Sequence, residues 1–240
     1  MTARQDNRPP RGRVGAIVEG AALAAVPAAL CACAAFGVEQ AALLSFATVA
    51  VSLLVFFAGF ERRAPRLREI MPAAVLAALA AAGRILFAPF PDFKPVSAIA
   101  IIAGVAFGRR CGFLVGSLAA LASNFFFGQG PWTPWQMYAW GMVGYLAGLI
   151  AQTGLFDTAP KTVYVYGFAS ALFYGLILNL WSILGFFHPQ TPGQFLAVYA
   201  AALPFDLTHG VATVVFLLAL FAPWRRKLDR ICRVYDLRND

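Results

Sequence analysis

The sequence predicts an all-α protein that crosses a lipid bilayer several times. Only 12% of its 240 residues are charged, whereas a typical soluble domain carries about 25%. The chain contains long uncharged apolar runs, and about 20 helical residues suffice to cross a hydrocarbon core of about 30 Å. The net charge of +8 sits in short clusters between these runs and at the two chain ends. This placement is typical of a cytoplasmic membrane face and argues against a nucleic-acid surface.

Eight apolar segments are expected to be helices. Five are continuous runs, at 14–36, 41–60, 70–88, 162–186 and 194–222. The stretch 95–151 is broken at Gly108-Arg109-Arg110 and at Pro131 and Pro134, which gives three further helices at 95–108, 111–127 and 135–152. The first run follows four arginines and could be mistaken for a signal peptide. It is long enough to span and a second run follows closely, so we expect it to be retained.

The positions of Lys and Arg predict the orientation. If residues 1–13 are cytoplasmic, the inner segments hold all but two of the 19 basic residues, the exceptions being Lys94 and Arg84. A wrong number of helices would scramble this bias. The sequence therefore predicts a multi-pass protein of the cell (cytoplasmic) membrane with both termini in the cytoplasm.

The basic linker at 61–69 divides the chain. The expected parts are a basic cytoplasmic N-terminus (1–13), an accessory hairpin (14–60), this linker, a six-helix core (70–222) and a basic cytoplasmic tail (223–240). The hairpin has little polar character beyond Glu19. The four cysteines fit neither a disulfide framework nor a complete zinc site, so no metal is expected.

The segment 124–136 faces outside in this topology and has the composition of a binding loop. Its glycines and prolines fix an irregular backbone. Trp132 and Trp135 offer broad flat surfaces, and Asn124, Gln129 and Gln136 offer paired donors and acceptors. An aromatic wall with convergent amides suits a pocket for a flat, polar organic molecule. The alternative is an aromatic belt at the level of the lipid headgroups.

Ionisable residues inside the spans are the second candidate feature. Arg84 lies about one turn from the outer end of its helix, where it could snorkel to the headgroups or bind an anionic group of a ligand. Asp206 and His209 are three residues apart and so share a helical face, just after Pro204. They could line a cavity, or form a pair that locks helix packing.

Two further helices carry candidates. Asn179 and Trp181 lie toward the outer end of 162–186, where they could complete the pocket or make ordinary hydrogen bonds between helices. Ala73, Ala77 and Ala81 form a stripe of small residues that would let another helix approach closely. Walker, His-Glu-x-x-His and Gly-x-Ser-x-Gly motifs are absent, so the chain is not expected to be an enzyme or to hydrolyse nucleotide by itself.

Residues 70–222 resemble the substrate-binding S component of energy-coupling factor (ECF) transporters, the bacterial vitamin importers. The resemblance rests on the six-helix core, the alanine stripe, the glycines of 104–116 and Pro204-Phe205-Asp206. Its most specific part is Ser123-Asn124 followed by Gly128-Gln-Gly-Pro-Trp-Thr-Pro-Trp-Gln136. The N-terminal hairpin departs from the six-helix plan.

The resemblance implies that the chain captures a vitamin or related micronutrient near the outer face, with a cobalamin-type branch favoured. It also implies docking through Ala73, Ala77 and Ala81 onto a transmembrane coupling subunit driven by two ATPases, which use the ATP, so that the chain binds no cofactor itself. Segment 89–95 would be an outer gate. The alternatives are a membrane-embedded enzyme using Asp206 and His209, and a gradient-driven carrier. The candidate substrate-contacting residues are Arg84, Asn124, Gln129, Trp132, Trp135, Gln136, Trp140, Asn179, Trp181, Asp206 and His209.

Overall fold

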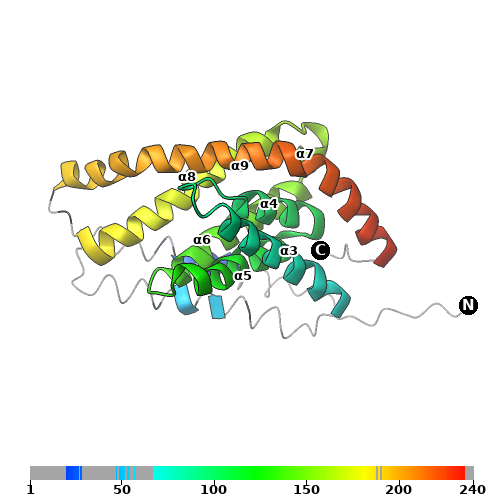
Figure 1. Ribbon diagram of the computed structural model, residues 1–240, viewed down its shortest axis with the longest axis horizontal. Coiled ribbons are helices and arrows are strands. Elements are labelled where there is room, and N and C mark those ends of the chain that lie inside the picture. The colour runs from blue at the N-terminus through cyan, green and yellow to red at the C-terminus, as the bar shows by residue number, and fades with distance from the viewer. Residues whose placement is uncertain are drawn as a thin grey trace, which may run out of the picture.

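The computed structural model describes residues 67–187, 189 and 191–235, together with scattered positions between 20 and 57. Every regular element in this part of the chain is a helix, which confirms the predicted all-α class (Figure 1). Most of the expected hairpin, including Glu19, lies outside the described residues, and so do residues 1–13 and His188.

The helices follow the apolar runs and end at the expected breaks. They are α3 (Leu67–Leu86), α4 (Val96–Phe107), α5 (Arg109–Phe127), α6 (Thr133–Gln152), α7 (Leu155–Thr158), α8 (Thr162–Ser182), a π-helical turn η1 (Ile183–Phe187) and α9 (Pro192–Tyr235). Gly108, with φ 91°, separates α4 from α5, and Gly128, with φ 99°, ends α5. Glycine adopts such positive φ values without the clash that a Cβ atom would cause.

Helix α4 lies at the centre of the described helices. Residues 96–106 are all buried, and the helix contacts α3, α5, α6, α8 and α9. A helix that is apolar on every side belongs inside a bundle. With only 12 residues it is shorter than a membrane span, and its neighbours surround it instead of lipid.

Helices α4, α5 and α6 approach each other through glycines. A Cβ atom added to Gly144 would lie 2.2 Å from the carbonyl oxygen of Gly112, and one added to Gly112 would lie 2.3 Å from that of Gly144. A Cβ on Gly104 would also lie 2.2 Å from the carbonyl oxygen of Gly144. Backbone therefore packs directly on backbone here, which is a common way for helices to associate in membranes.

The last helix is longer than the sequence predicts. The apolar run ends at residue 222, but α9 extends for 44 residues to Tyr235. Figure 1 shows α9 running along the other helices and changing direction in its red C-terminal part, which contains Pro223. Proline lacks a backbone donor and kinks a helix without ending it when the flanking turns remain bonded.

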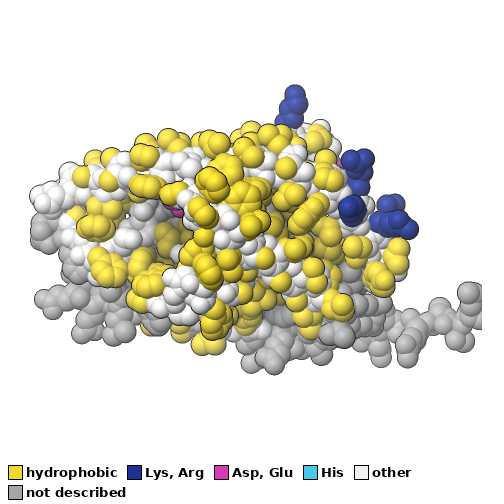
Figure 2. Space-filling view, viewed as in Figure 1, with side chains coloured by type: hydrophobic (Ala, Val, Ile, Leu, Met, Phe, Trp, Pro, Cys, Tyr) yellow, Lys and Arg dark blue, Asp and Glu magenta, His cyan; other side chains and the backbone are white. Residues whose placement is uncertain are grey.

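The outer surface is that of a membrane protein. Among the described residues, three helical stretches are long and apolar enough to cross a membrane: Arg109–Phe127, Thr162–Phe187 and Pro192–Tyr235. Ile70–Leu86 and Val96–Phe107 are apolar but shorter. On the face shown in Figure 2, hydrophobic side chains predominate and Lys and Arg gather at one end, where Figure 1 shows α7 and the end of α9.

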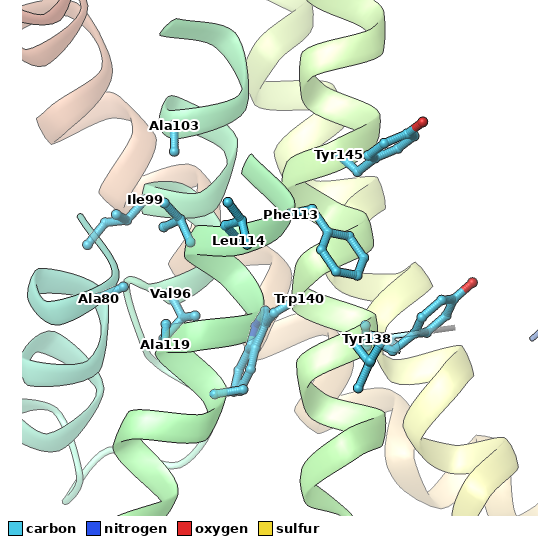
Figure 3. Packing of buried hydrophobic residues seen from close by; sticks show 14 of the residues in the cluster. Ala80, Val96, Ile99, Ala103, Phe113, Leu114, Ala119, Tyr138, Trp140 and Tyr145 are labelled. Atoms are coloured by element: carbon cyan, nitrogen blue, oxygen red, sulfur yellow. The ribbon is translucent and has the colours of Figure 1, made fainter. Parts of the chain in front are cut away.

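The described N-terminal positions pack against α6. The hydroxyl of Tyr138 donates to the carbonyl oxygen of Leu23 at 2.6 Å, and Val26 and Val49 are fully buried in the same core cluster. Figure 3 shows Tyr138 and Tyr145 projecting from α6 away from the side where Ala80 and Val96 lie. One face of α6 thus meets the N-terminal segment, which leaves another face for the interior of the core.

Candidate functional site

Arg84, in the last turn of α3, points into the protein and not toward the headgroups. Its Nη1 donates to Ser123 Oγ and to Asn124 Oδ1, both at 2.6 Å. The guanidinium carbon lies 4.7 Å from the centre of the Phe127 ring and 4.9 Å from that of Trp140. The guanidinium group is therefore held by neighbouring side chains, and its role toward a ligand or the headgroups stays a prediction.

Asn124 connects Arg84 to the loop before α6. This fully buried amide donates through Nδ2 to Thr133 Oγ1 at 3.0 Å and to Gln136 Oε1 at 2.8 Å. Thr133 Oγ1 donates to Gln129 Oε1 at 2.9 Å, and Gln129 Nε2 donates to the carbonyl oxygen of Leu121 at 3.0 Å. The three predicted amides therefore belong to one network, in which Asn124 bonds directly to Gln136 and Thr133 links Asn124 to Gln129.

Trp140, Ser97 and His209 form a second group beside Arg84. Trp140 Nε1 donates to Ser97 Oγ at 3.1 Å, and Ser97 Oγ lies 2.8 Å from His209 Nε2. Because Ser97 already accepts a bond from Trp140, its own proton is free to be donated to Nε2. Tyr174 stacks on Trp140 with ring centres 4.6 Å apart and meets the His209 ring edge-on at 5.1 Å.

Asp206 and His209 do not form the pair that their spacing allows. Asp206 Oδ2 accepts from Asn179 Nδ2 at 3.2 Å, whereas His209 bonds to Ser97 on α4. The Asp206 carboxylate lies against Gly175, where an added Cβ atom would be 2.0 Å from Oδ1. The two side chains thus form hydrogen bonds with different neighbours, so they do not form an acid–base pair with each other in this structure.

An aromatic group lies at the end of the bundle beyond the polar residues. The rings of Trp132 and Trp181 meet edge-on with centres 6.5 Å apart, and Trp181 meets Phe186 at 5.2 Å. A Cβ atom on Gly130 would lie 2.4 Å from the Trp132 ring, so glycine is needed for Trp132 to fold back over the loop. The loop before α6 and the end of α8 therefore meet, as the sequence suggested.

Trp135 has a different position from the other predicted tryptophan residues. It is fully buried in the core cluster that also contains Leu23, Val49 and Trp140. Among the described residues its Nε1 has no hydrogen-bond partner. Trp132, Gln136 and Trp140 recur every four residues and share one face of α6, whereas Trp135 lies about 100° away from Gln136. Trp135 thus lies on a different face of α6 from Gln136 and Trp140, and its contact with substrate stays a prediction.

The alanine stripe on α3 is also buried. Ala73, Ala77 and Ala81 are 3%, 4% and 6% exposed. In this conformation neighbouring parts of the chain cover these three residues, and their contact with a coupling subunit stays a prediction. The exposed residues of α3 lie beside the stripe, on the face that carries Met71, Ala74, Val75, Ala78, Leu79 and Ala82.

The segment between α3 and α4, the expected outer gate, is anchored at several points. Lys94 Nζ donates to the carbonyl oxygens of Phe87, Ala88 and Phe90. Phe87 and Phe93 both contact Phe216 on α9, with ring centres 5.1 and 5.4 Å away. Desolvation raises the pKa of Asp92 in this segment, and the charges of Lys94 and Arg84 oppose the rise.

Ser97, Phe127, Thr133 and Tyr174 belong to the site but were not candidates from the sequence. Serine and threonine in apolar helices usually satisfy local carbonyl groups, so neither type is a signal by itself. Tyr174 lies in an apolar run and has no motif around it. The available signal was its position next to Gly175.

The fold and this cluster define a helical membrane protein with a polar and aromatic site enclosed by its helices. Residues 64–227 match the profile of a family of unknown function (DUF6580), and the chain belongs to this family. The matched range contains the whole cluster described above and leaves out the N-terminal residues. No curated protein and no solved structure matches the chain.

Proposed function

We propose that this protein is the substrate-capture subunit of an ECF-type importer. It binds a vitamin or related micronutrient at the outer face of the cell membrane, without catalysing a reaction. A coupling subunit and two ATPases then drive release inside. In this proposal helices α3, α4, α5, α6, α8 and α9 form the binding core, and the N-terminal hairpin is an accessory module.

The observation that carries the proposal is where the polar cluster lies along the helices. Arg84 is at the C-terminal end of α3, Asn124 is near that of α5, and Ser97 and Gln136 are in the first turns of α4 and α6. These ends belong to one side of the bundle, next to the segments 87–95 and 128–132. Polar groups inside a membrane protein usually mark a substrate or ion pathway, because burying them in lipid is costly.

The positions of the basic residues support the proposed orientation of the protein in the membrane. Arg109 and Arg110 begin α5, at the end of the bundle opposite the cluster, and Arg225 pairs with Asp157 at that end. An excess of Lys and Arg is typical of the cytoplasmic side. The polar cluster would then open toward the outside, where a captured nutrient arrives.

Docking on the coupling subunit is proposed for the exposed face of α3. Ala74, Ala78 and Ala82 recur every four residues on this face, one position along from the buried stripe. Small residues would let a helix of the partner approach closely. Met71, Val75 and Leu79 flank them and supply apolar contact area.

Cysteine labelling tests the proposed topology. In a background lacking Cys31, Cys33, Cys111 and Cys232, Pro131→Cys should react with a membrane-impermeant maleimide in intact cells. Lys161→Cys should react only after permeabilisation, because it lies at the opposite end of the bundle. Both positions are exposed, so their reactivity reports sidedness and not burial. Labelling of Lys161→Cys but not Pro131→Cys in intact cells would invert the topology and remove the outward-facing receptor.

A ligand screen tests the proposed function. A panel with cobalamin, riboflavin, thiamine and biotin should contain a compound that raises the melting temperature of the purified protein without ATP. A ligand at 100 times its Kd stabilises the folded state by about 2.7 kcal/mol. Trp140→Phe should weaken this response, whereas Trp224→Phe, a tryptophan at the basic end, should not. If no vitamin stabilises the protein, capture of a vitamin is ruled out as its role.

Uptake assays test the proposed dependence on the coupling subunit and the ATPases. Uptake of the bound compound should require the ATPases and the coupling subunit. Uptake that persists in cells lacking ECF ATPases would identify a gradient-driven carrier instead. A membrane-embedded enzyme is disfavoured, because Asp206 and His209 have separate partners.

A further inference from the structure

The charge of Arg84 has no counterion within the described part of the chain. Its hydrogen-bond partners, Ser123 and Asn124, are neutral, and so are the rings of Phe127 and Trp140 that flank it. Asp92 acts on Arg84 electrostatically but forms no ion pair with it, and it acts on Lys94 as well. Asp206 acts on Asp92 in turn, so two acidic residues lie near two cations here, and neither carboxylate forms an ion pair with Arg84 in the described part of the chain.

The hydrogen bonds of Arg84 use only one end of its guanidinium group. Ser123 and Asn124 both bond to Nη1, and none of the described residues accepts from Nε or Nη2. A guanidinium group has five N–H donors in a fixed plane, so three of them remain available. The Nε and Nη2 donors point the same way and form the side-on fork that binds carboxylates and phosphates with two parallel bonds.

The surroundings hold this fork in one orientation. Phe127 and Trp140 lie over the guanidinium group with ring centres 4.7 and 4.9 Å from its central carbon, which fixes its plane. Asn124 cannot turn its amide around, because Nδ2 donates to Thr133 and Gln136 while Oδ1 accepts from Arg84. A donor that is already oriented loses less entropy when it binds an anion.

We infer that the Nε–Nη2 fork of Arg84 binds the carboxylate or phosphate group of the captured molecule, so that the ligands of this protein are small organic anions. The inference rests on the proposed function for the identity of the cargo as a transported nutrient. The binding chemistry itself follows from the unpaired fork and its fixed orientation.

Anion binding by the purified full-length chain tests the inference. The probes are benzoate and inorganic phosphate, with benzamide as the neutral isostere of benzoate, measured by melting temperature and calorimetry in phosphatidylcholine nanodiscs. Benzoate or phosphate should stabilise the native protein and benzamide should not. Arg84→Lys keeps the charge but loses the fork, and it should weaken anion binding about 10- to 100-fold. Arg225→Lys, at the opposite end of the bundle, should bind as the native protein does.

Asn124→Asp provides a second, independent variant. It would place a carboxylate against Nη1 and supply the missing counterion within the chain. The melting temperature should fall, because aspartate loses the donor to Gln136, and the folded fraction isolated by size-exclusion chromatography should no longer respond to benzoate or phosphate. Equal anion binding by the native protein, Arg84→Lys and Asn124→Asp would overturn the inference, as would stabilisation by benzamide equal to that by benzoate.

Two further measurements distinguish a lipid headgroup from a soluble anion, and a failure of the anion site from a failure of the proposed function. Stabilisation that appears only in nanodiscs containing phosphatidylglycerol, with no effect of soluble anions, would assign the fork to a lipid headgroup and overturn the inference. Anion binding without ATPase-dependent uptake would retain the site and reject the proposed function. ATPase-dependent uptake of a neutral vitamin, unchanged in Arg84→Lys, would retain the function and reject the anion site.

Discussion

Gly144→Val is expected to prevent the native packing of α5 against α6 and to remove most folded protein. A Cβ atom at this position would lie 2.2 Å from the carbonyl oxygen of Gly112, which is backbone and cannot turn aside. The two helices would have to separate, and overpacking of a close contact costs about 1–3 kcal/mol or more. The measurement is the yield of monodisperse protein in size-exclusion chromatography, together with its melting temperature.

Gly193→Ala is the matched control for this substitution. Gly193 is also a helical glycine, in α9, but the nearest atom to its added Cβ would be Thr191 Oγ1 at 4.0 Å. Its replacement should leave yield and melting temperature close to those of the native protein. A Gly144→Val protein as stable as Gly193→Ala would show that the contact between the α5 and α6 backbones does not stabilise the fold.

Asn124→Leu is expected to cause the second-largest loss of stability. Leucine has the same branched arrangement of four side-chain heavy atoms but is bulkier, and it cannot accept from Arg84 or donate to Thr133 and Gln136. Each buried polar group left without a partner costs on the order of 1–3 kcal/mol. Because three partners are affected at once, the melting temperature should fall strongly, and the loop before α6 should lose its attachment to α5.

Asn179→Leu tests whether this effect is specific to the network. Asn179 has a single side-chain bond, to Asp206, and is only partly buried. Its replacement should lower the melting temperature much less than Asn124→Leu does. Equal losses for the two variants would mean that Asn124 acts as an ordinary polar residue and does not hold the cluster together.

Much of the site could be proposed from the sequence because unusual residue types stood out against an apolar background. Arg84, Asp206 and His209 are costly inside membrane spans, and the loop at 128–136 is rich in Gly, Pro and Trp. The hydrogen-bond partners of these residues could not be predicted from the sequence. Arg84 bonds to residues 39 and 40 positions away, and Ser97 and His209 are separated by 112 positions. No local pattern connects helices so far apart in the chain.

The sequence by itself determined that lipid surrounds most of this protein and where its helices are interrupted. Long apolar runs require lipid around them, and Gly108, Gly128 and Pro134 end or begin helices through their own backbone preferences. Only the tertiary structure decided which face of each helix packs against other helices and which face stays exposed. Ala77 is buried while Ala78 is exposed, and Trp135 packs in the core while Trp132 meets Trp181. The reason is physical: one residue along a helix turns a side chain by about 100°, and the neighbour it then meets is set by the packing of other helices.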